Sequence, residues 1–226
     1  MRSRARRKHA SRLSRWISVL FVVGSSCFVV APLQPFVDLV GATTDGIVFF
    51  VGSVFFTSAA TLQWLETVNA DRTPDAPAMT STRVFAWEPD RIDWWSSGVQ
   101  LLGTLFFNIS TFRALSTAID QPSYDQVVWR PDAFGSVCFL VSGYLAYVEV
   151  AGGLLARPPA SLEGTIVAVN LFGCIAFGVS AVAAYVLPAT GEGLAVTAAN
   201  ATTSIGALAF LVGAVLLLPE ARREVV

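Results

Sequence analysis

The sequence predicts an all-α fold, an integral membrane bundle of six transmembrane helices built as three helical hairpins. Composition and a repeated motif carry this prediction. Of the 226 residues, 54% are hydrophobic and 14% are charged, and the mean hydropathy is +0.61. Soluble domains carry about 25% charged residues. We therefore expect this chain to lie in a lipid bilayer.

The repeated motif is a glycine followed by a small residue and, four positions after the glycine, by a phenylalanine. Residues four apart share a helix face, and small residues let membrane helices approach closely. We therefore interpret the glycines as helix-packing sites, each phenylalanine lying beside a neighbouring glycine. Because each glycine falls in the first half of its helix, we also expect the glycines to alternate between leaflets. The six glycines are Gly24, Gly52, Gly103, Gly135, Gly173 and Gly206, followed by Phe28, Phe56, Phe107, Phe139, Phe177 and Phe210.

The boundaries of the spans follow from length and proline positions. A bilayer core about 30 Å thick requires about 20 helical residues. Proline fits a first helical turn and otherwise ends a helix, and Pro32, Pro131 and Pro188 mark such boundaries. The expected spans are 16–36, 46–67, 95–116, 133–151, 164–187 and 197–218.

The glycine spacings group these spans into hairpins. Consecutive glycines are 28, 32 and 33 residues apart within the proposed pairs, and 51 and 38 residues apart between them. The predicted organisation is a basic cytoplasmic tail (1–15), hairpin one (16–67), a cytoplasmic loop (68–93), hairpin two (94–151) and hairpin three (164–218).

The basic residues predict the orientation, because Lys and Arg in short loops favour the cytoplasmic side. With both termini cytoplasmic, thirteen of the fifteen basic residues lie inside, and Arg113 and Arg130 lie outside. Lys8 is the single lysine, and this preference for arginine, with abundant Ala, Gly and Val, indicates a GC-rich bacterial genome. We expect a multi-pass protein of the bacterial plasma (inner) membrane whose first helix is retained rather than removed as a signal peptide.

The third expected span carries a polar stripe. Gln100, Thr104, Asn108 and Thr111 are spaced by four, four and three residues, which places them along one helix face. Asn170 occupies the corresponding register in the fifth span. Hydrogen bonds between helices explain such a stripe. A polar ligand or water path between the third and fifth spans is the alternative.

Two loops share the pattern Trp-x-Pro-Asp, at Trp87 to Asp90 and at Trp129 to Asp132. Tryptophan anchors a helix at the membrane interface, proline fits a first helical turn, and an acid there interacts well with the helix dipole. We expect these loops to be ordered, with Asp90 or Asp132 able to pair with Arg91 or Arg130.

The sequence offers no signature of an enzyme. It lacks nucleophile, phosphate-loop and metalloprotease motifs, and its single histidine, His9, lies outside every expected span. Cys27, Cys138 and Cys174 are isolated in three spans, so we expect no disulfide, metal or cofactor. With a net charge of -1, nucleic acid is an unexpected partner. The expected partners are the lipid bilayer, further copies of the chain, or another membrane complex.

Two segments carry a resemblance to a known family. Phe50 to Phe56 reads FVGSVFF and Phe134 to Phe139 reads FGSVCF. Hairpins with this motif resemble the small bacterial membrane proteins called YrhK-like. The resemblance covers the first four expected spans, whereas Cys174 and Ala207 stand where the motif has serine or threonine. It implies a two-helix unit and no catalytic residue.

These observations lead to two expected functions. The first is a non-enzymatic structural or assembly subunit that packs with itself or with a membrane complex through its small-residue faces. The alternative is a small-solute transporter or channel with a polar path along the third span.

Overall fold

The computed structural model describes residues 2–70, 82–116, 124–187 and 193–223, and all of its elements in these ranges are helical. The all-α fold is therefore confirmed. The long helices are α1 (Arg2–Val30), α3 (Ala42–Val68), α4 (Ile92–Ala114), α6 (Arg130–Ala151), α7 (Leu162–Ala183) and α8 (Val196–Arg223). Two shorter elements, α2 (Gln34–Val40) and the π-helix η1 (Asp125–Trp129), lie between them.

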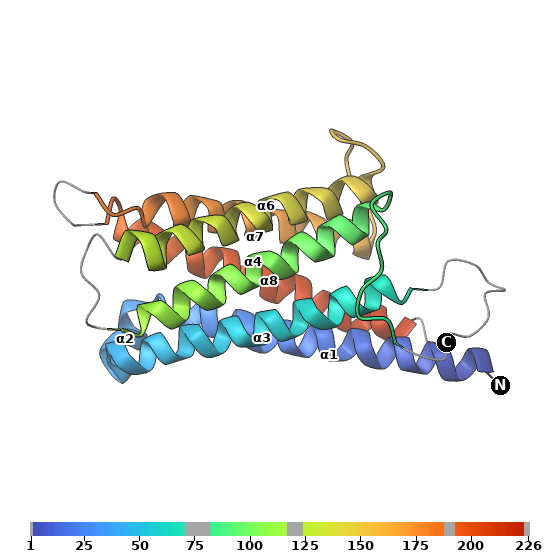
Figure 1. Cartoon of the computed structure of the whole chain (residues 1–226), viewed down its shortest axis with the longest axis horizontal. Helices are drawn as coiled ribbons and strands as arrows, with labels where there is room; N and C mark the ends of the chain where they lie inside the picture. Colours follow the sequence, from blue (N-terminus) through green and yellow to red (C-terminus); the bar gives the residue numbers. More distant parts are fainter. Residues whose placement is uncertain (1, 71–81, 117–123, 188–192, 224–226) are drawn as a thin grey trace.

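The long helices form a closed ring. Each one packs against the next in the order α1, α3, α4, α6, α7 and α8, and α8 returns to pack against α1. The start of α1 and the end of α8 lie at the same end of the bundle (Figure 1), here called the terminal end. The connections that contain α2 and η1 lie at the opposite, far end (Figure 1). A ring of six elongated helices leaves a common interior that all of them can line.

Within the part of the chain that the structure describes, five helical segments are long and apolar enough to cross a membrane: Arg12–Val30, Ala42–Val68, Asp125–Ala151, Leu162–Ala183 and Val196–Leu218. These segments identify the chain as a helical membrane protein. The helix α4 is not among them, because Ser, Thr, Gln and Asn side chains lower its hydropathy.

The first expected span, 16–36, extends six residues beyond the end of its helix, which lies at Val30. The helix α1 already begins at Arg2, so the basic tail expected over 1–15 continues this helix. The helix stops at Val30 because Pro32 lacks an N–H group and disfavours helical geometry at the residue before it. The chain then forms α2, which has Pro35 in its first turn and ends at Val40, before Gly41, where φ is 81°. The other five expected spans agree with the observed helices to within a few residues.

The expected glycine contacts are present, but the expected alternation between leaflets is wrong. The glycines meet in pairs within α1–α3, α4–α6 and α7–α8. A Cβ atom on Gly24, Gly103 or Gly173 would lie 3.0–3.1 Å from the carbonyl oxygen of Gly52, Gly135 or Gly206, respectively. Because the two glycines of a pair are in contact, they share one height in the bundle. In α7–α8 both glycines lie ten residues from the connection between these helices.

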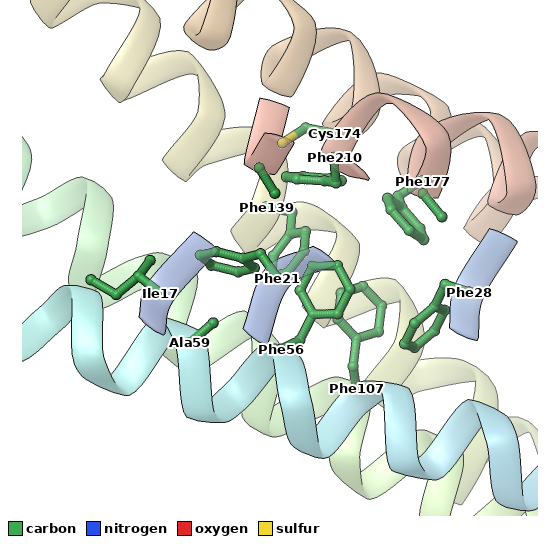
Figure 2. Close-up of a cluster of buried hydrophobic side chains, with 12 residues drawn as sticks. Ile17, Phe21, Phe28, Phe56, Ala59, Phe107, Phe139, Cys174, Phe177 and Phe210 are labelled. Atoms are coloured by element: carbon green, nitrogen blue, oxygen red, sulfur yellow. The ribbon is translucent and has the colours of Figure 1, made fainter. Parts of the chain in front are cut away.

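The six phenylalanines form a layer across the centre of the ring, here called the phenylalanine layer. Each is 8% exposed or less. Rings from different pairs touch: Phe56 lies 5.9 Å from Phe210, and Phe107 lies 6.0 Å from Phe177, between ring centroids. Figure 2 shows the rings converging from opposite helices. The layer is the core of the bundle and separates its two ends.

We predict that Gly103→Ala lowers the free energy of unfolding by up to about 2 kcal/mol. The new Cβ would lie 2.8 Å from Phe139 Cδ1 and 3.1 Å from the carbonyl oxygen of Gly135. Such overpacking costs about 1–3 kcal/mol, which outweighs the gain of about 1 kcal/mol in helix propensity. Thermal unfolding in detergent measures the change. Gly153→Ala is the control, since the nearest atom to its Cβ is 3.5 Å away; equal shifts in both variants would contradict this account of the glycine contacts.

Candidate functional site

The polar stripe on α4 is divided by the phenylalanine layer. Thr104, which follows the paired glycine Gly103, is 0% exposed and donates a hydrogen bond to the carbonyl of Leu101 at 2.7 Å. It lies at the level of the layer and is satisfied within its own helix. The residues on either side of Thr104 along the stripe therefore lie in different environments.

On one side, Asn108 and Thr111 bond directly to the neighbouring helix α3. Asn108 Nδ2 donates to Thr57 Oγ1 at 2.8 Å, and the hydroxyls of Thr111 and Ser53 lie 2.9 Å apart. Thr111 also donates to the carbonyl of Phe107 at 2.8 Å. These contacts match the expected interhelical hydrogen bonds. This part of the stripe lies in a helix contact, and Asn108 also lines a second cavity, which is formed by residues of α1, α3 and α4.

On the terminal side of the layer, Gln100 and Asn170 line the same cavity, here called the chamber. Its volume is about 340 Å³, and all six long helices contribute residues to it. These two residues come from the third and fifth expected spans, between which the alternative interpretation placed a polar path. The polar residues of the chamber are Ser14, Gln63, Glu66, Ser96, Gln100, Ser142 and Asn170.

The chamber has a polar side and an apolar side. Most of its polar residues come from α3, α4 and α6, whereas α7 and α8 contribute Ile166, Val167, Ala214 and Leu217. Such a mixed lining, with a few polar groups on an otherwise apolar wall, is typical of small-molecule sites.

Hydrogen bonds connect the polar side. Ser142 Oγ donates to Gln100 Oε1 at 3.4 Å, and Ser96 Oγ donates to the carbonyl of Ser142 at 3.0 Å. Ser14 Oγ donates to Glu66 Oε1 at 2.7 Å. The serines and the acid therefore satisfy one another, and Gln100 is oriented by Ser142.

Two buried amide oxygens in the chamber have no hydrogen-bond partner among the described residues, namely Gln63 Oε1 and Asn170 Oδ1. Asn170 packs against Gly213, where the Cβ of any other residue would overlap its amide oxygen. Buried polar groups are normally hydrogen-bonded to protein or to water. Water can reach almost none of the surface of these two oxygens, so each would gain a partner only if its amide group rotated toward the chamber.

The floor of the chamber is aromatic. Phe21, Phe139 and Phe210 come from α1, α6 and α8, and the thiol of Cys174 lies beside them (Figure 2). Cys174 is 3% exposed. The floor is continuous with the phenylalanine layer, so the chamber is closed toward the far end.

Sequence reasoning missed Gln63, Ser96 and Ser142, because single serines and glutamines are common in membrane helices. Their register relative to the paired glycines would have identified the lining. Gln100 and Asn170 lie three residues before Gly103 and Gly173, and Ser96 lies seven residues before Gly103. Ser142 lies seven residues after Gly135. Equivalent positions in the repeat therefore face the same interior.

An aromatic cluster lies at the ends of α3 and α4, outside the chamber. Trp94 contacts Trp64, Phe85, Trp87 and Trp95, with ring centroids 4.8–6.4 Å apart. Three indole N–H groups donate to the carbonyls of Val84, Ala86 and Pro89. The segment before α4 is therefore ordered, as expected, and these tryptophans fix it to the bundle.

The expected ion pairs of the Trp-x-Pro-Asp loops are wrong. Arg91 pairs with Glu88, at 2.6 Å, and with Asp93. Its guanidinium also donates to the carbonyl of Thr67 at 3.1 Å, which directs it toward α3 and away from Asp90. Arg130 pairs with Asp125 at 3.0 Å and not with Asp132, because η1 brings Asp125 close to it.

No group of three or more His, Cys, Asp or Glu residues within the described ranges could hold a metal ion. Comparisons with protein-family models, curated proteins and solved structures found no match to this chain. The chamber is therefore interpreted from its own residues.

We predict an energetic coupling of about 0.6 kcal/mol, and at most about 1.7 kcal/mol, between Asn108 and Thr57, the range of hydrogen bonds between membrane helices. A double-mutant cycle with Asn108→Leu and Thr57→Val, read by unfolding in detergent, measures it. Thr61→Val replaces Thr57→Val as the control, since the Thr61 hydroxyl bonds within its own helix. Equal coupling energies in both cycles would show that the hydrogen bond between Asn108 and Thr57 makes no specific contribution to the free energy of unfolding.

Proposed function

We propose that this chain is a non-enzymatic bacterial inner-membrane protein that crosses the bilayer six times and takes a small polar solute into the chamber as part of a transport cycle. The observation that carries this proposal is the chamber itself. It is a polar-lined cavity inside the bundle, on the terminal side of the phenylalanine layer, and two of its lining residues have buried amide oxygens without a described partner.

The exposed face of α4 supports the proposal that this helix also crosses the bilayer, in addition to the five apolar segments. Gly103, Thr104, Phe107 and Ser110 are buried, so part of the polarity of this helix faces its neighbours. The outward positions are apolar and exposed, as lipid contact requires; they are Leu102, Leu105, Ile109 and Phe112. With α4 included, the bundle has three hairpins: α1 with α3, α4 with α6, and α7 with α8.

The charge distribution supports cytoplasmic termini. Thirteen of the fifteen basic residues lie in segments on the terminal side of this topology, and basic residues favour the cytoplasmic side. In this orientation the chamber faces the cytoplasm and the phenylalanine layer closes it toward the outside.

The expected assembly function depended on small-residue faces that could bind another protein. All six paired glycines instead contact one another inside this chain. An assembly function would therefore need a different surface, whereas the chamber directly supports solute binding. A relationship to YrhK-like proteins remains a proposal at the level of the two-helix unit and contributes no function.

The native thiol of Cys174 provides a test. In a Cys27→Ala/Cys138→Ala background, both replacements keep the Cβ atoms that contact Gly52 and Gly103. We predict that a small water-soluble methanethiosulfonate added on the terminal side of sealed vesicles modifies Cys174, because water fills a polar chamber of this size. Mass spectrometry measures the extent.

The control compares the rates at which Cys174 is modified from the two sides of the membrane. The same reagent added on the far side should react at least about tenfold more slowly, because the aromatic rings exclude water along that route. A thiol that stays unmodified from the terminal side, while unfolded protein reacts fully, would overturn the proposed function.

A further inference from the structure

The chemistry of the chamber specifies the class of solute, an inference that rests on the proposed function. We propose that the chamber binds one uncharged solute with a hydrogen-bonding edge and an apolar face, of the kind found in an amide attached to a ring. The argument combines the charge, the polar groups, the apolar surface and the volume of the chamber.

The lining has little charge. Among the side chains that the structure describes, no Lys, Arg or His lines the chamber, and Glu66 is its single acid. Glu66 already accepts a hydrogen bond from Ser14 at 2.7 Å. A buried charge is costly unless it is paired. The described lining offers an anion no positive side chain, and it offers a cation only Glu66, which already accepts a hydrogen bond. Binding of a charged solute is therefore unfavourable.

Three of the seven polar residues of the chamber carry primary amides, and they come from three different helices. Gln63 lies on α3, Gln100 on α4 and Asn170 on α7. Each amide offers two donors and one acceptor oxygen, so the set matches a solute edge that carries both kinds of group. The oxygens of Gln63 and Asn170 are buried without a described partner, so a rotation of either amide toward the chamber would give its oxygen a donor from the solute.

The opposite side excludes a solute that is polar on every face. Ile166, Val167 and Leu217, together with the aromatic floor, offer no hydrogen bonds from their side chains. Hydroxyls of a polyol placed against them would lose their water partners without replacement, which is costly. A solute with one apolar face avoids this cost and gains from burial.

The volume sets the size. A chamber of about 340 Å³ lies at the small end of ligand pockets, which span about 300–1,000 Å³. One ring with one polar substituent fits such a space.

Three probes of nearly identical shape test the inference: benzamide, which is neutral, benzoate, an anion, and benzamidinium, a cation. The readout is the rate of Cys174 modification in the Cys27→Ala/Cys138→Ala protein. We expect benzamide to slow this reaction in a saturable manner, and benzoate and benzamidinium at equal concentration to leave it unchanged. Protection by benzoate or benzamidinium that equals or exceeds that by benzamide would overturn the inference.

Two variants connect protection to the amides. Gln100→Leu and Asn170→Leu should each weaken benzamide protection roughly tenfold, because each removes a hydrogen-bonding group from a buried site. Asn108→Leu is the matched control, because Asn108 is an amide on the same stripe of α4 that bonds to Thr57 outside the chamber. Benzamide should protect Cys174 in this variant as well as it does in the parent protein. The modification rate without probe and the thermal unfolding midpoint show that each variant is folded.

The outcomes separate the two proposals. If Cys174 reacts from the terminal side but benzamide gives no protection, or if the Asn108 control loses protection as fully as the chamber variants do, the inferred solute class is wrong and the proposed function stands. If Cys174 does not react from that side at all, the proposed function itself is wrong.

Discussion

The close approach of paired glycines is the constraint on which the rest of the structure depends. In each pair, a glycine backbone lies where the Cβ of any other residue would meet a carbonyl oxygen 3.0–3.1 Å away. Lipid supplies no hydrophobic drive between helices, so close backbone packing and interhelical hydrogen bonds must hold the bundle together. Because the glycines meet at one height, the two phenylalanine rings of each pair also come into contact, with centroids 4.9–5.8 Å apart. The phenylalanine layer is the direct consequence.

The same register explains why a cavity lies beside the layer. One turn beyond Phe56, Phe139 and Phe210, the second helix of each pair has small residues, which are Ala59 and Ala60, Ser142 and Gly143, and Gly213 and Ala214. Large rings fill the ring of helices at the layer, whereas small side chains leave space one turn away. The first helices add Gln100 and Asn170 at this level. Alternation of large and small residues within a repeat therefore produces both the closed layer and the chamber.

The sequence was sufficient to predict the helices and the glycine contacts, because both depend on local sequence patterns. Five expected spans agree with observed helices, and every motif glycine lies in the helix contact expected for it. The expectation of alternating leaflets failed because it treated each helix alone, whereas the height of Gly24 is set by its contact with Gly52. The chamber was not predicted as a whole because Gln63, Ser96 and Ser142 are unremarkable in isolation. Its lining becomes recognisable when positions are counted from the paired glycines.

The polar stripe of α4 shows how one sequence pattern can combine two structural roles. Asn108 and Thr111 face α3, where Thr57 and Ser53 offer hydroxyls at 2.8 Å and 2.9 Å, so these residues stabilise a helix contact. Gln100, two turns earlier, instead faces the interior and is oriented by Ser142. The layer between them contains ring pairs as close as 4.9 Å, between Phe107 and Phe139. Each aromatic pair contributes about 0.5–1.5 kcal/mol beyond its buried area, so opening the layer requires several contacts to break together. Passage of a solute beyond the chamber therefore needs a rearrangement of the helix pairs and cannot follow from side-chain motion at a single ring.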